Sequence, residues 1–193
     1  MHSRPPLRAV VAIAALAVFT VWITWRAKAI EMGGRFENSP SPLIGKPAPD
    51  FALESLDGPK ISLAGYRGKT LVATFWASWC GPCRLEIPLL VKLYRETHKP
   101  DSGFEILAIS IDTKKEDAQG AAKTLKIPFP VLLDQESHIA DTYHVDAIPT
   151  LFLIDKNGKI TYAHTGYTMG LDFMLAQQLG IKSYSPTPAG GGR

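Results

Sequence analysis

The chain has two cysteines, and both stand between a strand pattern and a helical pattern. Residues 70–76 form an apolar run with a valine and two aromatic residues, which is typical of a strand buried on both faces. Cys80 and Cys83 follow within the sequence WCGPC. Beyond them, apolar residues recur at helical spacing, namely Leu85, Leu89, Leu90, Leu93 and Tyr94. The segment therefore predicts a strand, a turn that carries both thiols, and a helix.

The patterns in the rest of the chain predict the α/β class. Further strands are expected at 104–111 and 131–133, hairpins at 50–62 and 150–164, and helices at 114–125, 137–143 and 171–179. In the second hairpin, Asn157 and Gly158 supply the positive φ values of a tight turn. This order predicts a central mixed β-sheet flanked by helices, with an N-terminal β-hairpin extension. Open sheets place their sites at the carboxyl ends of strands, so the cysteine turn is the expected active site.

The 193 residues, 46% of them apolar, suffice for one buried core of about 100–150 residues and an additional segment. Glycine and proline predict a linker before the domain, and the polar end SYSPTPAGGGR predicts a flexible tail. The predicted organisation is a short basic segment at 1–8, a transmembrane anchor at 9–25, a linker at 26–42, the domain at 43–181 and the tail at 182–193.

Residues 9–25 contain no charge, and a helix of this length lies near the lower end of a bilayer span. A cleavable signal peptide is the alternative, because Ala27-Lys28-Ala29 fits a small-x-small cleavage pattern. The apolar run is longer than the roughly 7–15 residues usual in signal peptides, and Trp22 and Trp25 suit a membrane interface. The sequence thus favours an N-terminal transmembrane helix.

Basic residues flank this segment on both sides, so their count does not decide its orientation. Arg4 and Arg8 precede it, and Arg26, Lys28 and Arg35 follow it. A single N-terminal apolar segment followed by a redox-type cysteine pair favours an exported domain. We therefore expect a single-pass protein of the inner (cytoplasmic) membrane, with its catalytic domain on the periplasmic or extracytoplasmic side.

Composition argues against several other classes. The 21 basic and 18 acidic residues leave a small positive charge without a long basic run, which argues against a nucleic-acid partner. Two neighbouring cysteines exclude a scaffold of several disulfides. A zinc site usually needs four ligands, and the five histidines are scattered, so no metal site is expected: His2, His98, His138, His144 and His164.

Redox chemistry is therefore the expected role of the pair. A cysteine at the start of a helix lies near unpaired N–H groups and the positive end of the helix dipole, which favour its thiolate. Cys80, behind an exposed Trp79, is the expected nucleophile, and Cys83, one turn further on, is expected to resolve the mixed disulfide. Pro82 suits a first helical turn, and Gly81 leaves room for a partner chain.

Three ordered motifs carry a family resemblance. They are GKPAPDF at 45–51, ATFWASWCGPCRLEIP at 73–88 and VDAIPTLFLID at 145–155. The chain resembles the thioredoxin superfamily, and within it the membrane-anchored ResA/TlpA type, over roughly residues 43–181. The resemblance implies a thioredoxin-like fold, protein thiols and disulfides as substrates, and no cofactor apart from the Cys80–Cys83 disulfide.

The resemblance also implies roles for other residues. Pro149 matches a cis proline that faces the cysteines, which would leave the backbone of Ile148 able to pair with an extended substrate. Thr74 stands where thioredoxins have an aspartate that transfers protons. ResA-type proteins instead carry a glutamate three residues after the second cysteine, so Glu86 is expected to be half-buried, with a pKa raised by desolvation, and to move protons to and from the thiols.

The expected activity is a protein-disulfide reductase, because CGPC is the motif of reducing thioredoxins. The resemblance implies substrates such as the haem-attachment cysteines of apocytochrome c or oxidase assembly factors, and a membrane electron donor of the CcdA or DsbD kind. Two alternatives stay open. A thiol peroxidase, with antioxidant activity, would usually have Thr or Ser where Ala77 stands, and a copper-binding assembly factor of the Sco type would have wider cysteine spacing and a matching histidine.

Overall fold

The computed structural model describes residues 41–185. The predicted anchor at 9–25, the predicted linker up to residue 40 and the predicted tail beyond residue 185 lie outside these residues. Within residues 41–185, none of the helices combines the length and the apolar character that crossing a bilayer requires.

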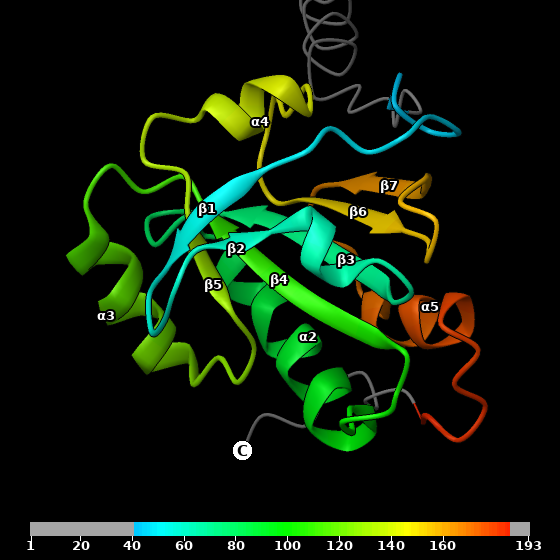
Figure 1. Ribbon diagram of the computed structural model, residues 1–193. Coiled ribbons are helices and arrows are strands. Elements are labelled where there is room, and N and C mark those ends of the chain that lie inside the picture. The colour runs from blue at the N-terminus through cyan, green and yellow to red at the C-terminus, as the bar shows by residue number, and fades with distance from the viewer. Residues whose placement is uncertain (1–40, 186–193) are drawn as a thin grey trace, which may run out of the picture. The chain divides into compact units, whose positions relative to one another are not determined.

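A seven-stranded mixed sheet forms the centre of the domain, in the order β2-β1-β5-β4-β3-β6-β7 (Figure 1). Its strands are β1 (Ala52–Ser55), β2 (Ile61–Ser62), β3 (Thr70–Trp76), β4 (Phe104–Ser110), β5 (Val131–Leu133), β6 (Thr150–Ile154) and β7 (Ile160–Thr165). The three central strands β3, β4 and β5 are parallel, and the pairs at either side are antiparallel. The expected mixed sheet and the N-terminal hairpin are confirmed.

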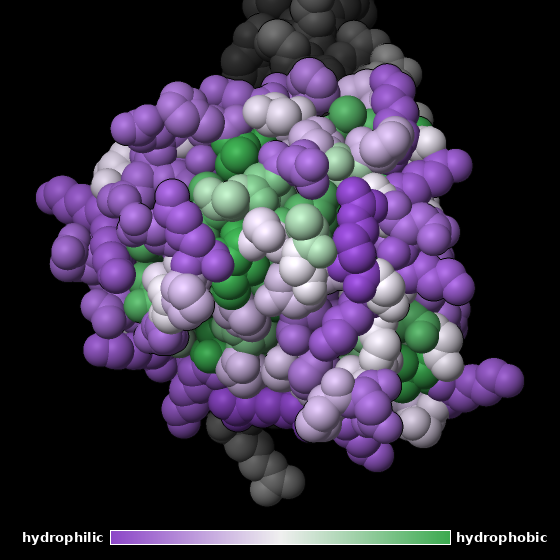
Figure 2. All heavy atoms as spheres, in the orientation of Figure 1, coloured by the Kyte–Doolittle hydropathy of each residue, from purple (hydrophilic) through white to green (hydrophobic). Residues whose placement is uncertain are grey.

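Helices cover both faces of this sheet. They are η1 (Leu63–Tyr66, a 3-10 helix), α2 (Cys83–Thr97), α3 (Lys115–Leu125), α4 (His138–Thr142) and α5 (Leu171–Gln178). Side chains alternate along β3, so Val72 and Trp76 pack with α2, α3 and α5, whereas Ala73 and Phe75 pack with α4 and η1. Figure 2 shows the second face, where hydrophobic side chains remain visible at the centre within a hydrophilic surround. The thicker helical layer therefore lies on the side of the sheet that carries the cysteine helix.

The turn between β6 and β7 differs in detail from its prediction. Gly158 has a φ of 81°, but Asn157 does not have a positive φ. The Gly158 N–H donates to the Asp155 carbonyl, and the Asp155 N–H donates to the Lys159 carbonyl, both at 2.8 Å. This is a three-residue connection, in which only the last residue needs a positive φ. The expectation for Asn157 is therefore wrong, although the hairpin itself is confirmed.

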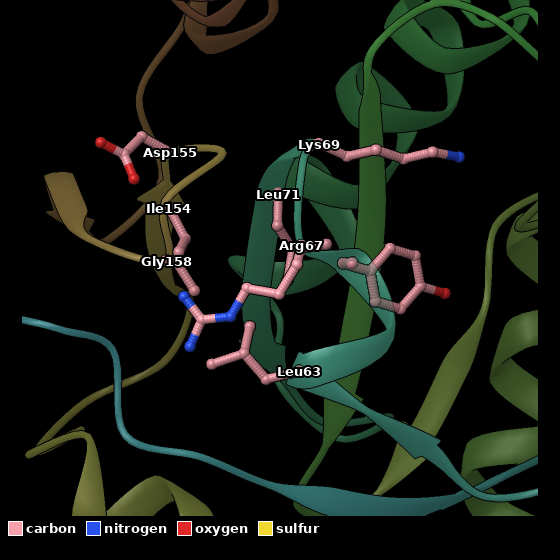
Figure 3. A pocket seen from close by; sticks show the side chains of 8 residues that line it. Leu63, Arg67, Lys69, Leu71, Ile154, Asp155 and Gly158 are labelled. Carbon is pink, nitrogen blue, oxygen red and sulfur yellow. The ribbon is translucent and has the colours of Figure 1, made fainter.

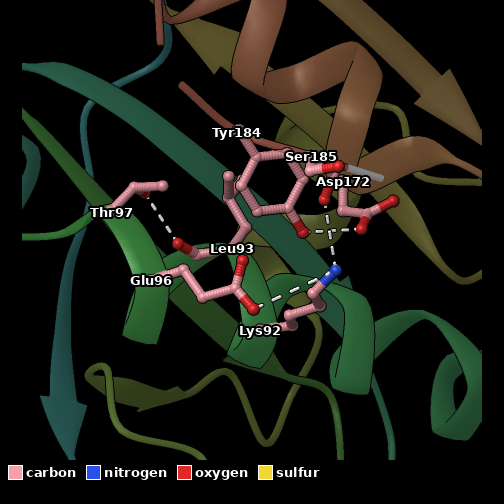
Figure 4. A network of polar contacts seen from close by, with 7 residues as sticks. All are labelled: Lys92, Leu93, Glu96, Thr97, Asp172, Tyr184 and Ser185. Carbon is pink, nitrogen blue, oxygen red and sulfur yellow. Dashed lines mark hydrogen bonds and ion pairs between the residues drawn. The ribbon is translucent and has the colours of Figure 1, made fainter. Parts of the chain in front are cut away.

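Tyr184 corrects the predicted start of the tail at residue 182. Its side chain is buried, and its hydroxyl donates to Oδ2 of Asp172 at 2.6 Å (Figure 4). The ammonium group of Lys92 lies 5.1 Å from the centre of the Tyr184 ring and donates to the Ser185 carbonyl. The segment is polar overall, but the aromatic ring of Tyr184 packs with the core formed by α2 and α5.

Candidate active site

Cys80 and Cys83 form a disulfide at the point where β3 gives way to α2. Cys83 is the first residue of α2 and is fully buried, whereas 5% of Cys80 is exposed. Because β3 is a central strand, the loop at 77–82 emerges in the middle of the sheet edge. Of the two cysteines, Cys80 is therefore the more accessible to a partner.

The start of α2 provides the electrostatic environment of Cys80. The backbone N–H of Cys83 points at Cys80 Sγ, with a nitrogen–sulfur distance of 3.1 Å. Backbone N–H groups in the first turn of a helix stabilise negative charge, so a thiolate at Cys80 gains a hydrogen bond and a favourable dipole when the disulfide is reduced. The same arrangement favours Cys80 as the leaving group when a mixed disulfide between Cys80 and a partner is attacked at the partner's sulfur.

The loop before β6 faces the disulfide across the sheet edge. The Ile148–Pro149 peptide bond is cis, as the resemblance implies, and the carbonyl oxygen of Ile148 lies 3.7 Å from Cys80 Sγ. The Gly166 N–H donates to the Pro149 carbonyl at 2.7 Å, and this bond ties the loop after β7 to the proline. Three segments distant in sequence therefore meet at Cys80.

Exposed apolar side chains lie on two of these segments. Trp79 is 69% exposed, and Gly81 and Pro82 beside it are also exposed. Tyr167 and Met169, on the loop tied to Pro149, are 38% and 71% exposed. The sequence analysis did not identify Tyr167 and Met169. The feature that could have indicated them is the presence of large apolar residues in a short loop between a strand and a helix. Large exposed apolar groups beside a reactive sulfur suit the binding of a protein partner.

Glu86 is more deeply buried than the sequence analysis expects, with 1% of its surface exposed. It lies three residues after Cys83, on the same side of α2. Its Oε1 accepts a hydrogen bond from the Thr74 hydroxyl at 2.9 Å. Burial raises the pKa of Glu86 from 4.5 to about 7, and the bond from Thr74 opposes this rise. Glu86 can therefore hold or release a proton near neutral pH.

Two buried polar atoms in the described part of the chain have no hydrogen-bond partner, Oε2 of Glu86 and Nε1 of Trp76. Trp76 is fully buried in the same cluster as Cys83. Buried polar groups without a hydrogen-bond partner are rare and destabilising, so their presence beside a reactive group suggests a functional role. Both atoms belong to residues near the Cys80–Cys83 disulfide.

Asp112 is a site residue that the sequence analysis missed. It is buried, and its carboxylate accepts hydrogen bonds from the Ser78 N–H at 2.9 Å and from the Ser78 hydroxyl at 2.7 Å. The Ser110 hydroxyl also donates to it at 2.8 Å. Asp112 thereby fixes the loop that carries Cys80 to the end of β4. An acid just beyond a buried strand, at the edge where sites form, was the available signal.

Three histidines of the domain have partners away from the disulfide. His98 pairs with Glu105 at 3.4 Å, His138 pairs with Glu136 at 2.8 Å, and His164 shares a hydrogen bond with Thr168 at 2.9 Å. Across residues 41–185, His, Cys, Asp and Glu side chains do not gather in groups of three or more that could hold a metal ion. The chemistry that this geometry offers is that of the disulfide.

Comparisons with known proteins agree with this geometry. Residues 44–163 match the AhpC/TSA family. The chain is 39% identical over 123 residues to the thiol-disulfide oxidoreductase ResA of Geobacillus thermodenitrificans, covering 64% of this chain and 70% of that one. It is 36% identical over 122 residues to ResA of Bacillus subtilis, covering 63% and 67%.

Solved structures show the same thioredoxin-like fold. One is a protein of Chlorobium tepidum assigned as the thiol:disulfide interchange protein DsbE, with a TM-score of 0.65 and 34% identity over 70% of this chain and 94% of that chain. Another is the thioredoxin domain of a thiol-disulfide oxidoreductase of Bacteroides vulgatus, with a TM-score of 0.63 and 28% identity over 72% and 98%.

Proposed function

The chain belongs to the AhpC/TSA family and is a thiol-disulfide oxidoreductase similar to ResA, and on this basis we propose that it reduces disulfides in exported proteins from a membrane anchor. The observation that carries the thiol-disulfide exchange is the pairing of an accessible Cys80 with a fully buried Cys83 and a buried Glu86, and the CGPC motif favours the reducing direction. An attacking sulfur, a resolving sulfur and a proton acceptor are what thiol-disulfide exchange through a mixed disulfide requires.

The reaction begins with the reduced dithiol. The Cys80 thiolate attacks one sulfur of a substrate disulfide, that disulfide breaks, and the departing substrate sulfur takes up a proton. The Cys83 thiol then gives its proton to the Glu86 carboxylate, and the Cys83 thiolate attacks Cys80. The second substrate sulfur leaves as a thiolate, and the Cys80–Cys83 disulfide forms. Two electrons pass from the dithiol to the substrate, and Glu86 returns its proton to the second substrate sulfur or to water.

Substrate binding uses the groups that surround Cys80. An extended substrate segment lies along the backbone of Ile148, next to the cis Pro149, in the manner of an added strand. Trp79, Gly81 and Pro82 form the other wall, where the glycine lets the partner backbone approach. The short distance between the Ile148 carbonyl and Cys80 Sγ supports this arrangement, because a substrate sulfur must reach the same place.

The cellular context follows from the N-terminal sequence. Residues 9–25 anchor the protein in the inner membrane, with the domain on the extracytoplasmic side. Electrons arrive from a membrane transporter of the CcdA or DsbD kind, and the substrates are thiol proteins such as apocytochrome c or oxidase assembly factors. The uncharged N-terminal segment and the ResA relatives support this context.

Peroxide reduction is a weaker candidate in this geometry. Ala77 occupies the position at which peroxidases usually have a hydroxyl, and the two nearby hydroxyls already have partners. Thr74 donates to Glu86 and Ser78 donates to Asp112. A copper-binding role is tested separately by titrating the reduced chain with Cu(I), and tight stoichiometric binding would favour it.

Single-cysteine variants test the proposed function. With a disulfide-containing protein as substrate, Cys83→Ser should accumulate a mixed disulfide through Cys80, whereas Cys80→Ser should form none. Non-reducing electrophoresis and mass spectrometry detect the adduct. Equal trapping by both variants, or by neither, would contradict the assigned roles.

A further inference from the structure

A cluster of positive charge surrounds the turn between β6 and β7. The guanidinium group of Arg67 lies against Gly158 and donates to the Asn157 carbonyl (Figure 3). The carbonyl of Lys156 accepts a hydrogen bond from the Gly68 N–H, so the segment that carries Arg67 and the turn that carries Lys156 are in direct contact. Lys69 points away from Arg67 and does not contribute to the cluster (Figure 3).

The first described residues of the chain add to this cluster. The Ile160 N–H donates to the Lys46 carbonyl at 2.9 Å, and Pro47 pairs with Lys159. The side chains of Lys46, Lys156 and Lys159 are exposed, as is Arg67. These four residues, Lys46, Arg67, Lys156 and Lys159, are here named the basic pole.

One acidic residue, Asp155, belongs to the segments that form the basic pole. Its Oδ1 accepts hydrogen bonds from the N–H groups of Asn157 and Lys159, both at 2.9 Å. These bonds, the one from Lys159 first, hold the pKa of Asp155 below its usual value. The four basic residues and Asp155 together carry a net charge of +3.

The basic pole lies at the end of the sheet remote from the disulfide. Arg67 precedes the start of β3, and the cysteines follow its end. Likewise, β6 begins beside Pro149 and ends at the turn that carries Lys156. Seven residues of β3 at about 3.3 Å each separate the two ends by roughly 20 Å.

We propose that the basic pole docks on an anionic phospholipid surface, so that the domain holds its disulfide directed away from the membrane. This inference rests on the proposed membrane anchor. The described chain enters the domain at the basic pole, because the segment at 41–46 contacts β7 through the Gly45 N–H and the Ile160 carbonyl. Charge complementarity selects an anionic surface as the partner.

Because the chain that precedes the domain is short, even a weak attraction between the basic pole and the lipid headgroups is sufficient for docking. If residues 9–25 span the membrane, the fifteen residues at 26–40 reach at most about 54 Å when fully extended. A tether of this length confines the domain near the bilayer and gives the basic pole a high effective concentration there. Exposed lysines interact with anionic headgroups over a Debye length of about 8 Å at physiological salt, so the contact must be close and salt-sensitive.

Amide hydrogen exchange of the full chain in lipid nanodiscs tests the proposal. One nanodisc contains phosphatidylglycerol in phosphatidylcholine, and the other contains phosphatidylcholine alone. With the anionic lipid, peptides that cover residues 155–159 should exchange about threefold more slowly, as expected when roughly two thirds of the molecules are docked. Peptides from α3 should not change, and high salt should remove the difference.

Two triple variants of equal charge provide the matched control. Lys46→Gln, Lys156→Gln and Lys159→Gln together should abolish the slowing, whereas Lys114→Gln, Lys115→Gln and Lys123→Gln, also at exposed positions, should retain it. The chain could insert into both nanodiscs and show no slower amide exchange with the anionic lipid, or both triple variants could lose the slowing equally. Either result would overturn the docking and leave the anchor intact. A chain that enters neither nanodisc would overturn the anchor and the docking together. Disulfide reductase activity, assayed in parallel, reports on the proposed reaction independently.

Discussion

At the level of single residues, Glu86 carries the most demanding chemistry, because a buried carboxylate near its pKa can pass protons in either direction. Its raised pKa of about 7 predicts an inflection near that pH in the rate of disulfide reduction. Glu86→Gln should remove the inflection and slow the reaction by about a hundredfold, since general acid–base catalysis contributes about that factor. Stopped-flow rates over a pH series measure this. Superimposable profiles for the two proteins would contradict the role of Glu86.

The same carboxylate predicts how stability depends on pH. Glu86 has a pKa of 4.5 when unfolded and about 7 when folded, so the folded protein retains a proton that the unfolded chain loses. The stabilisation is complete below pH 4.5 and is lost as the pH rises to about 7, with a total of about 3 kcal/mol. Urea unfolding of the oxidised protein should show this fall. Glu86→Gln should lack it, and Glu96→Gln, which changes an exposed acid on the same helix, should keep it.

Sequence reasoning identified some site residues and missed others for a physical reason. Cys80 and Cys83 follow from a motif placed between a strand and a helix, and Glu86 was assigned from a family resemblance. Asp112 was missed because its importance comes from burial and from its bonds to Ser78, which lies 34 residues away in the sequence. Contacts of this kind leave no local pattern.

At the level of elements, Asp112 joins the end of β4 to the loop that carries Cys80. Asp112→Ala should lower the free energy of unfolding by about 3 kcal/mol, because three donors lose an anionic partner. It should also slow disulfide reduction between about tenfold and about a hundredfold, since the nucleophile loses its fixed position. Asp134→Ala is the control, because this buried acid binds the N–H groups of Ile139 and Ala140 at α4. It should destabilise the fold without slowing the reaction, and equal slowing by both would refute a specific role for Asp112.

The C-terminal segment stabilises the helix pair formed by α2 and α5. Tyr184→Phe should cost about 1 kcal/mol through the lost bond to Asp172, and Tyr184→Ala about 3 kcal/mol through the additional loss of buried surface. Denaturant midpoints measure both changes. The exposed Tyr167→Ala should leave the midpoint unchanged. A Tyr184→Ala protein as stable as the wild type would show that the segment is a dispensable tail.

The boundaries of helices and strands were predicted well where the apolar periodicity is strong. They were predicted less well where a single side-chain contact or turn residue determines the structure. The prediction for β3 coincides with the structure, and that for α3 differs by one residue, because a buried strand and an amphipathic helix have distinct repeats. The predicted start of the tail at residue 182 was wrong, because it rested on the polar composition of the segment and the ring of Tyr184 is nevertheless buried. The β6–β7 turn has a positive φ at Gly158, as predicted, but it is of another turn type than the one expected.

At the level of the whole molecule, the order of elements predicted a mixed sheet but not the order of its strands. The N-terminal hairpin extends the sheet beside β5, on the side remote from β6 and β7, and this long-range pairing has no signature in the local sequence. The consequence for function is that β3 occupies a central position. The disulfide therefore emerges at the middle of one sheet edge, and the basic pole lies at the other.

The reduction potential of the Cys80–Cys83 pair tests most directly whether this protein is a reductant. The full chain is equilibrated with mixtures of reduced and oxidised dithiothreitol at pH 7, and the fraction of disulfide is read after acid quenching and thiol alkylation. A reductant of the thioredoxin kind should have a potential of about −270 mV or below. A potential of about −120 mV, typical of a strong oxidant, would contradict the proposed direction of electron flow.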